Sequence, residues 1–190
     1  MKRGLTLLLI PLFFLCSACG QSAGREDFLA LRAAWLAAPV RLCAAVSADY
    51  GDRVWDFRLV YEGDGEQGSL TVLEPERIEG VGAELVKGET LRLVCDGALL
   101  DTGALFGNAA TPLQALPLTV LAVREGFVAS TWRETVAGER LTVAAIDATP
   151  AGDDEKTIYT VWFSPGEPSL RRAEISVDGY TILTMDMEEG

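Results

Sequence analysis

Short segments of alternating residues, separated by turn-forming residues, constrain the fold of this chain more than any other feature. Trp55, Phe57 and Leu59 alternate with other residues, which is the period of a β-strand that buries one face. Turn-forming stretches such as Tyr50-Gly51-Asp52 and Asp178-Gly179 recur at a spacing typical of antiparallel sheets. Strands are predicted over about 40–46, 55–61, 70–74, 90–95, 98–101, 127–135, 140–147, 156–163, 170–177 and 180–187. The pattern therefore predicts a long antiparallel meander.

Two segments follow a helical pattern instead. Apolar residues at spacings of three and four predict a helix over about 27–37. Thr111 and Pro112 are typical of a second helix start, and Pro117 favours a kink that divides this segment in two. A sheet of this length needs a filling on its concave face, which the helices can supply. The predicted fold class is α+β, a curved antiparallel half-open β-barrel wrapped around two or three helices.

The first 18 residues have the layout of a bacterial export signal. Two basic residues precede an apolar run over 5–15 that is too short to span a bilayer, and small residues stand directly before Cys19. Cutting before Cys16 would leave bulky residues where small ones are required, so Cys19 is the predicted lipidation site. A plain secretory signal and an uncleaved anchor are the alternatives. The predicted organisation is a signal peptide over 1–18, a lipidated tether over 19–26 and a single domain over 27–190.

Composition excludes several classes of function. The net charge of −12 would repel nucleic acids, and the absence of histidine removes the usual general base and the commonest metal ligand. The stretch Glu62–Glu66 is only loosely similar to a calcium loop and is predicted to be a hairpin turn. The carboxylates of Asp147, Asp153, Asp154 and Glu155 have no spacing typical of a catalytic pair. We expect no enzymatic activity, no cofactor, no metal and no nucleic-acid partner.

Cysteines and apolar residues leave two questions open. Cys43 and Cys95 could form a disulfide outside the cytosol or remain buried free thiols. Ten apolar residues on predicted apolar faces could line a ligand-binding cavity between sheet and helices, or could be ordinary core. These candidate ligand-binding residues are Trp35, Trp55, Phe57, Leu59, Leu70, Val72, Leu116, Leu121, Trp132 and Trp162.

Several motifs resemble the LolA/LolB-like lipoprotein superfamily. They are Val46-Ser-Ala-Asp-Tyr-Gly, Asp56-Phe-Arg-Leu-Val-Tyr, Gly68-Ser-Leu-Thr-Val-Leu-Glu-Pro, Val94-Cys-Asp-Gly and Thr111-Pro before a helix. The resemblance implies an unclosed LolA-like barrel whose helices cover a hydrophobic cavity for acyl chains. Carriers of that superfamily have a basic residue before the strand-ending proline, where this chain has Glu74. Carriers are also soluble, whereas this chain is predicted to be anchored, as are related Gram-positive and spore-former germination lipoproteins.

The resemblance and the signal together predict a membrane-anchored envelope lipoprotein. It would sit on the extracytoplasmic face of the cell membrane through lipid on Cys19, with acyl chains such as palmitate, and bind a lipid or a lipoprotein acyl chain. The alternative is a non-catalytic scaffold for an envelope protein, for example a cell-wall hydrolase, because one clostridial relative partners a cell-wall amidase.

Overall fold

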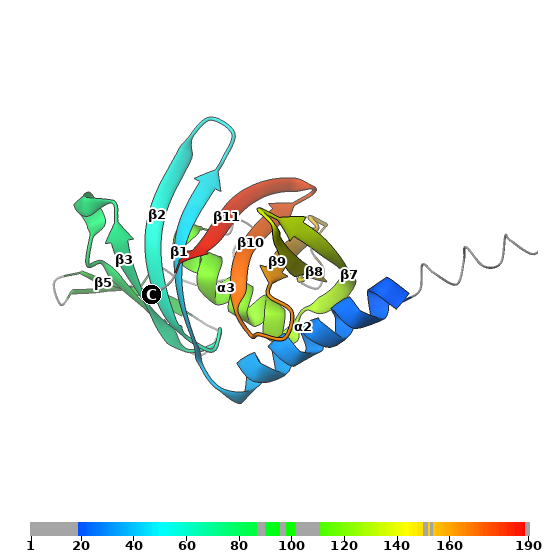
Figure 1. The fold of residues 1–190 in the computed structure, drawn as a ribbon. Coiled ribbons are helices and arrows are strands. Elements are labelled where there is room, and N and C mark those ends of the chain that lie inside the picture. Colours follow the sequence, from blue (N-terminus) through cyan, green and yellow to red (C-terminus); the bar gives the residue numbers. More distant parts are fainter. Residues whose placement is uncertain are drawn as a thin grey trace, which may run out of the picture.

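A computed structural model describes residues 19–86, 90–95, 98–101, 111–149, 152 and 154–188 (Figure 1). The predicted signal peptide, the Asp96-Gly97 turn and Asp153 lie outside the described residues. The strands are β1 (Val40–Asp49), β2 (Val54–Gly63), β3 (Gly68–Glu74), β4 (Gly82–Val86), β5 (Thr90–Cys95), β6 (Ala98–Asp101), β7 (Phe127–Val136), β8 (Glu139–Asp147), β9 (Thr157–Phe163), β10 (Leu170–Val177) and β11 (Tyr180–Glu188). The helices are α2 (Cys19–Ala37), the short 3-10 helix η1 (Glu76–Ile78) and α3 (Pro112–Glu125).

The described strands form one antiparallel sheet of 11 strands in the order β6-β5-β4-β3-β2-β1-β11-β10-β9-β8-β7. The sheet is a meander in two halves, which meet where β1 pairs with β11, from Cys43 opposite Glu188 to Ala48 opposite Leu183. Strands β6 and β7 form the two edges, so the curved sheet is open (Figure 1). The predicted fold class, an α+β half-open barrel around helices, is confirmed.

Each predicted strand is present, and one strand was missed. Strand β4 contains only two alternating apolar residues, Ala83 and Leu85, and begins at a glycine, which weakens the sequence signal. Both side chains are buried in the core. The strand forms because it pairs with β3 and β5, a tertiary effect that its own sequence does not encode.

The two main helices differ from their predictions. Helix α2 begins at Cys19 rather than near residue 27, so the predicted tether over 19–26 is helical. Gly24 is buried against Thr131 of β7, and this packing offsets the low helix propensity of glycine. Helix α3 is one helix with Pro117 inside it, rather than two short ones. Its first turn is stabilised by Thr111, whose backbone N–H donates to Oε1 of Gln114 at 3.1 Å.

The hydrophobic core lies between the concave face of the sheet and the two helices. Helix α3 runs inside the curve of the sheet, and α2 lies along one margin (Figure 1). Leu116 and Val120 of α3 are fully buried there. Phe28 and Leu31 of α2 belong to the same core. The concave face is therefore a packed core over much of its described area.

Arginines join the C-terminal ends of the two helices reciprocally. Arg32 of α2 donates from Nε to the carbonyl oxygen of Val123 at 2.7 Å and from Nη2 to that of Gly126 at 2.6 Å. Arg124 of α3 donates from Nη1 to the carbonyl oxygen of Trp35 at 2.7 Å. Carbonyl groups at a helix C-terminus lack partners within the helix, and cations there also favour the helix dipole. These bonds fix the end of α2, which forms a wall of the candidate site.

Candidate functional site

The two halves of the sheet separate at one end of the barrel. Strand β11 ends at Glu188, which pairs with Cys43, so β1 extends beyond it toward Val40. On the other side, the first β10 residue that pairs with β11 is Arg172. Beyond these pairs no described strand lies between β1 and β10. This end of the barrel, here called the mouth, is therefore open at the seam of the two halves.

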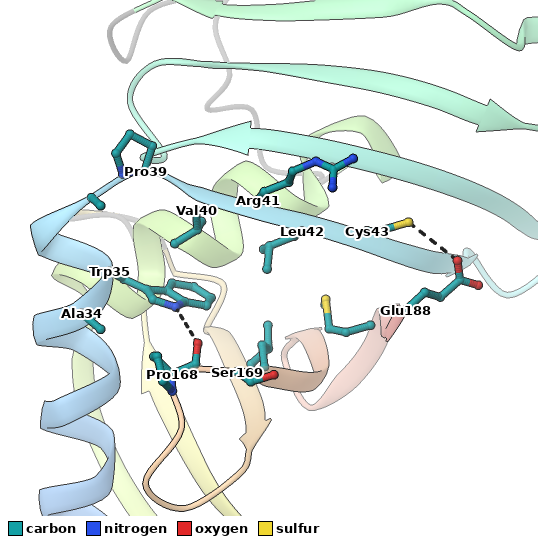
Figure 2. Close-up of a pocket in the computed structure, with 13 residues that line it drawn as sticks. Ala34, Trp35, Pro39, Val40, Arg41, Leu42, Cys43, Pro168, Ser169 and Glu188 are labelled. Atoms are coloured by element: carbon teal, nitrogen blue, oxygen red, sulfur yellow. Dashed lines mark hydrogen bonds between the residues drawn. The ribbon is translucent and has the colours of Figure 1, made fainter. Parts of the chain in front are cut away.

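A cavity of about 380 Å³ lies at the mouth. Its residues come from the end of α2, the start of β1, the segment before β10 and the end of β11 (Figure 2). They are Ala34, Trp35, Ala38, Pro39, Val40, Arg41, Leu42, Cys43, Pro168, Ser169, Leu170, Met187 and Glu188. Most of them are apolar, and the charged ones are limited to Arg41 and Glu188. The cavity volume falls within the range of about 300–1,000 Å³ that is usual for small-molecule sites.

Trp35 forms the inner wall of the cavity. Its side chain is only 3% exposed, and its indole Nε1 donates to the carbonyl oxygen of Pro168 at 3.3 Å (Figure 2). This bond joins the end of α2 to the segment that precedes β10. Val40 and Leu42 project into the cavity from the opposite side (Figure 2). The cavity is thus held between a fixed indole and the first residues of β1.

Charged groups lie at one side of the cavity. Arg58 donates from Nε to Oε2 of Glu188 at 2.6 Å, and this hydrogen bond raises the pKa of Arg58. The thiol of Cys43 lies 3.7 Å from the same carboxylate oxygen. Arg41 forms no ion pair with any residue in the described part of the chain. The apolar lining residues of the mouth could therefore contact the apolar body of a ligand, while the charged groups lie near its polar end.

The structure decides between the two alternatives for Cys43. Its thiol is free and buried. Strands β2, β3 and β4 separate β1 from β5, the strand of Cys95. Four inter-strand steps of about 4.8 Å place the two backbones far beyond the roughly 7 Å limit for a disulfide. Cys43 is therefore a thiol at the cavity wall and not half of a Cys43–Cys95 bridge.

Of the ten candidate ligand-binding residues, Trp35 lines the mouth cavity and the other nine are not among its lining residues. Leu59, Leu70, Val72 and Leu116 are buried core residues. Trp55 and Phe57 are on the concave face but toward the far end of β1, where Trp55 pairs with Ala48. Leu121 lies on α3 beside Gly65, in the β2–β3 turn.

Trp132 and Trp162 lie on the convex face, so their predicted position between sheet and helices is wrong. Both are paired with Val143 of β8, while its neighbour Ala144 points into the core. Both indole Nε1 groups donate to Oε2 of Glu134, at 3.3 and 3.4 Å. Val143 is fully buried although it faces outward, since the two indoles flank it. They cover Val143 on the outside of the barrel.

The other candidate sites have structural roles. The β2–β3 turn is a hairpin turn, as predicted: Oδ1 of Asp64 accepts from the backbone N–H groups of Glu66 and Gln67. The hydroxyl of Tyr61 accepts from the N–H of Gly65 at 2.8 Å, and burial raises the pKa of Tyr61 to about 12. The Thr149 hydroxyl lowers the pKa of Asp147. Asp147 also accepts from the backbone N–H of Thr149 at 3.1 Å, so its side chain orders the segment that follows β8.

Two further properties follow from the described residues. No group of three or more Cys, Asp or Glu side chains in that part of the chain could hold a metal ion. None of the helices found there has the length and apolar character needed to cross a membrane.

The fold and site together define an open antiparallel half-barrel filled by helices, with a cavity at its mouth that exposes polar and apolar surface in similar amounts. No family model matches the chain, and no curated protein matches its sequence significantly. Similar solved structures include an uncharacterized conserved protein from Thermus thermophilus, with a TM-score of 0.47, 9% identity and coverage of 86% of this chain and 83% of that one. A putative outer membrane lipoprotein-sorting protein domain from Vibrio parahaemolyticus has a TM-score of 0.46, 9% identity and coverage of 90% of both chains. A LolA superfamily protein from Nitrosomonas europaea has a TM-score of 0.40, 10% identity and coverage of 80% of this chain and 84% of that one.

Proposed function

We propose that this protein is a lipid-anchored envelope lipoprotein that binds an amphiphile, such as a lipid or a lipoprotein acyl chain, in the mouth cavity. The observation that carries the proposal is the cavity itself, with Trp35, Leu42 and Met187 in its lining and charged groups at one side. Transfer of each methylene group from water to such a wall contributes about 0.8 kcal/mol. The polar end of the amphiphile would remain near Arg41 and water.

The anchor in this proposal is the lipid on Cys19. The export-signal pattern before this residue supports it, and α2 begins at the same residue. Two or three acyl chains make membrane attachment stable, whereas a single chain does not. The amphiphile in the cavity is a separate, non-covalent ligand.

A second candidate function is a scaffold that binds an envelope protein without any lipid. The filling of the concave face by α3 favours this candidate, because packed side chains leave less room for a ligand there. The two functions differ in what occupies the mouth cavity.

The substitution Ala34→Trp tests the first proposal. Ala34 lines the cavity, and a large indole there would fill it, so we expect affinity for a fluorescent fatty-acid probe to fall at least about tenfold. The matched control is Ala33→Trp, since Ala33 is the preceding residue of α2 and is exposed. Circular dichroism checks that both variants fold. Equal binding by wild type and folded Ala34→Trp protein would exclude the mouth cavity as the ligand site.

A further inference from the structure

The mouth cavity ends at the same depth on every element that lines it. On each element, the core residue next to the cavity is no more than 1% exposed and is not part of the lining. These residues are Leu31 on α2, Ala44 on β1, Ala173 on β10 and Met185 on β11. Because protein interiors are close-packed, these side chains close the cavity toward the centre of the barrel. A ligand therefore enters the mouth only as far as this level.

The lining residues of β1 give the depth of the cavity. They run from Val40 to Cys43, and three steps along a strand measure about 10 Å. In an extended hydrocarbon chain, two carbon–carbon bonds of about 1.5 Å advance the chain by about 2.5 Å. An acyl chain that runs along β1 would therefore place about eight carbons inside the cavity. The remaining carbons of a longer chain would stay outside the mouth.

The width of the cavity is that of one missing strand. Beyond Glu188, where the described part of β11 ends, the cavity separates β1 from residues 168–170. One strand between two others holds their backbones about 10 Å apart, at about 4.8 Å per step. Leu42 and Leu170 line this gap from its two sides and take up part of the width. The remaining space fits one hydrocarbon chain and not two chains side by side.

Polar and apolar lining residues lie on opposite faces of β1. Val40 and Leu42 point into the cavity, whereas Arg41 points away from them (Figure 2). Glu62 of β2 is the exposed cross-strand neighbour of Arg41, so charges of both signs lie on this outer face. The outer face therefore accommodates a polar end group without selecting one sign of charge. Selection by the cavity acts on the acyl chain.

Trp35 closes the inner end of the cavity. Leu31 lies one turn before it on the same side of α2, and the hydrogen bond from the indole to the carbonyl oxygen of Pro168 fixes the ring at this level. We propose that the mouth cavity accepts one acyl chain to a depth of about eight carbons, and that Trp35 sets this limit. This selectivity rests on the proposed function, because it applies to an amphiphile bound in the mouth cavity.

A chain-length series tests the depth. Fatty acids from hexanoic to hexadecanoic acid, each below its critical micelle concentration, displace the fluorescent fatty-acid probe from the full chain carrying Cys19→Ala, in which no covalent acyl chain competes. We expect the affinity to rise about fourfold per methylene group up to about eight to ten carbons and to level off beyond that length. A rise that continues unchanged to hexadecanoic acid would overturn the depth limit and leave the ligand site intact. Failure of every fatty acid to displace the probe would contradict the proposed function itself.

Substitution of Trp35 tests its role in the same assay. Trp35→Ala removes the indole above Leu31, so we expect the length at which the affinity levels off to increase by at least about two carbons. The matched control is Trp35→Phe, which lacks the Nε1 donor but keeps an aromatic ring and should keep the wild-type length. Circular dichroism checks folding, and Trp35→Leu replaces Trp35→Ala if the latter does not fold. An unchanged length in the folded variant would show that Trp35 does not set the limit.

A pair of phospholipids with the same head group tests the width. Dioctanoyl phosphatidylglycerol and octanoyl lysophosphatidylglycerol differ by one acyl chain, and both are used below their critical micelle concentrations. We expect their affinities to differ by no more than about twofold, because a second chain that stays outside the cavity adds no buried methylene groups. An affinity for the two-chain lipid that is higher by about tenfold or more would show that the cavity holds both chains, and would overturn the limit to one.

Discussion

Phe28→Ala is expected to lower the free energy of unfolding by about 3–5 kcal/mol. Phe28 is fully buried, and its ring meets that of Phe163 in β9 edge to face, with centroids 6.2 Å apart. The guanidinium carbon of Arg32 lies 4.9 Å from the centroid of the Phe28 ring. Alanine would leave a cavity between α2 and the sheet and remove both ring contacts. Urea denaturation of the domain, followed by circular dichroism, measures the change.

The control for this variant is Leu29→Ala, at the next position of the same helix. Leu29 is about half exposed, so its truncation is expected to change stability by no more than about 0.5 kcal/mol. If Phe28→Ala does not fold, the milder Phe28→Leu still allows the comparison. Equal effects of substitution at Phe28 and at Leu29 would show that α2 does not pack on β9 as described.

Arg32→Met is expected to cost about 2–3 kcal/mol, because it leaves carbonyl groups of the α3 C-terminus without their charged donor. Methionine keeps much of the apolar stem of arginine, so the loss reports on the hydrogen bonds to Val123 and Gly126. The same bonds position the end of α2, and Trp35 with it. We therefore also expect weaker binding of the fatty-acid probe by Arg32→Met, measured at a temperature where the variant is folded.

Arg25→Met is the matched control for Arg32→Met. Arg25 is exposed on the same side of α2 and has no ion-pair partner in the described chain, so its loss should barely change stability or probe binding in solution. Comparable losses of stability in both variants would mean that the removal of one positive charge causes the loss, and not the removal of the hydrogen bonds to the end of α3.

The strand pattern could be predicted because alternation and turn residues are local properties. Asp178 and Gly179, for example, mark a turn regardless of the rest of the chain. The start of α2 could not be predicted, because Gly24 is helical owing to its contact with Thr131, more than 100 residues away in the sequence. Strand β4 likewise depends on its neighbours in the sheet.

The face to which an apolar residue points was harder to predict than the strand that contains it. Strand β8 buries Val143 on the convex face and Ala144 on the concave face, so apolar character does not identify the inner face. Trp132 and Trp162 were assigned to the interior for this reason. Register with β8 decides their position, and a single sequence does not reveal it.

The mouth cavity itself had only a faint sequence signal. Its walls come from Trp35, from Val40 and Leu42, and from residues near Pro168 and Met187. These segments are far apart in the chain and meet only because β11 ends between β1 and β10. Trp35 was found because it is a large aromatic residue on a predicted helix. The other lining residues resemble ordinary strand and turn residues until the sheet has formed.

Native mass spectrometry of residues 20–190, released from the envelope of the cells that made them, tests whether the mouth cavity binds an amphiphile. We expect a population carrying one additional mass, that of an amphiphile with at least one acyl chain, which is lost in Ala34→Trp and kept in Ala33→Trp. Wild-type protein without such a mass, or with the same mass in both variants, would contradict binding in the mouth cavity.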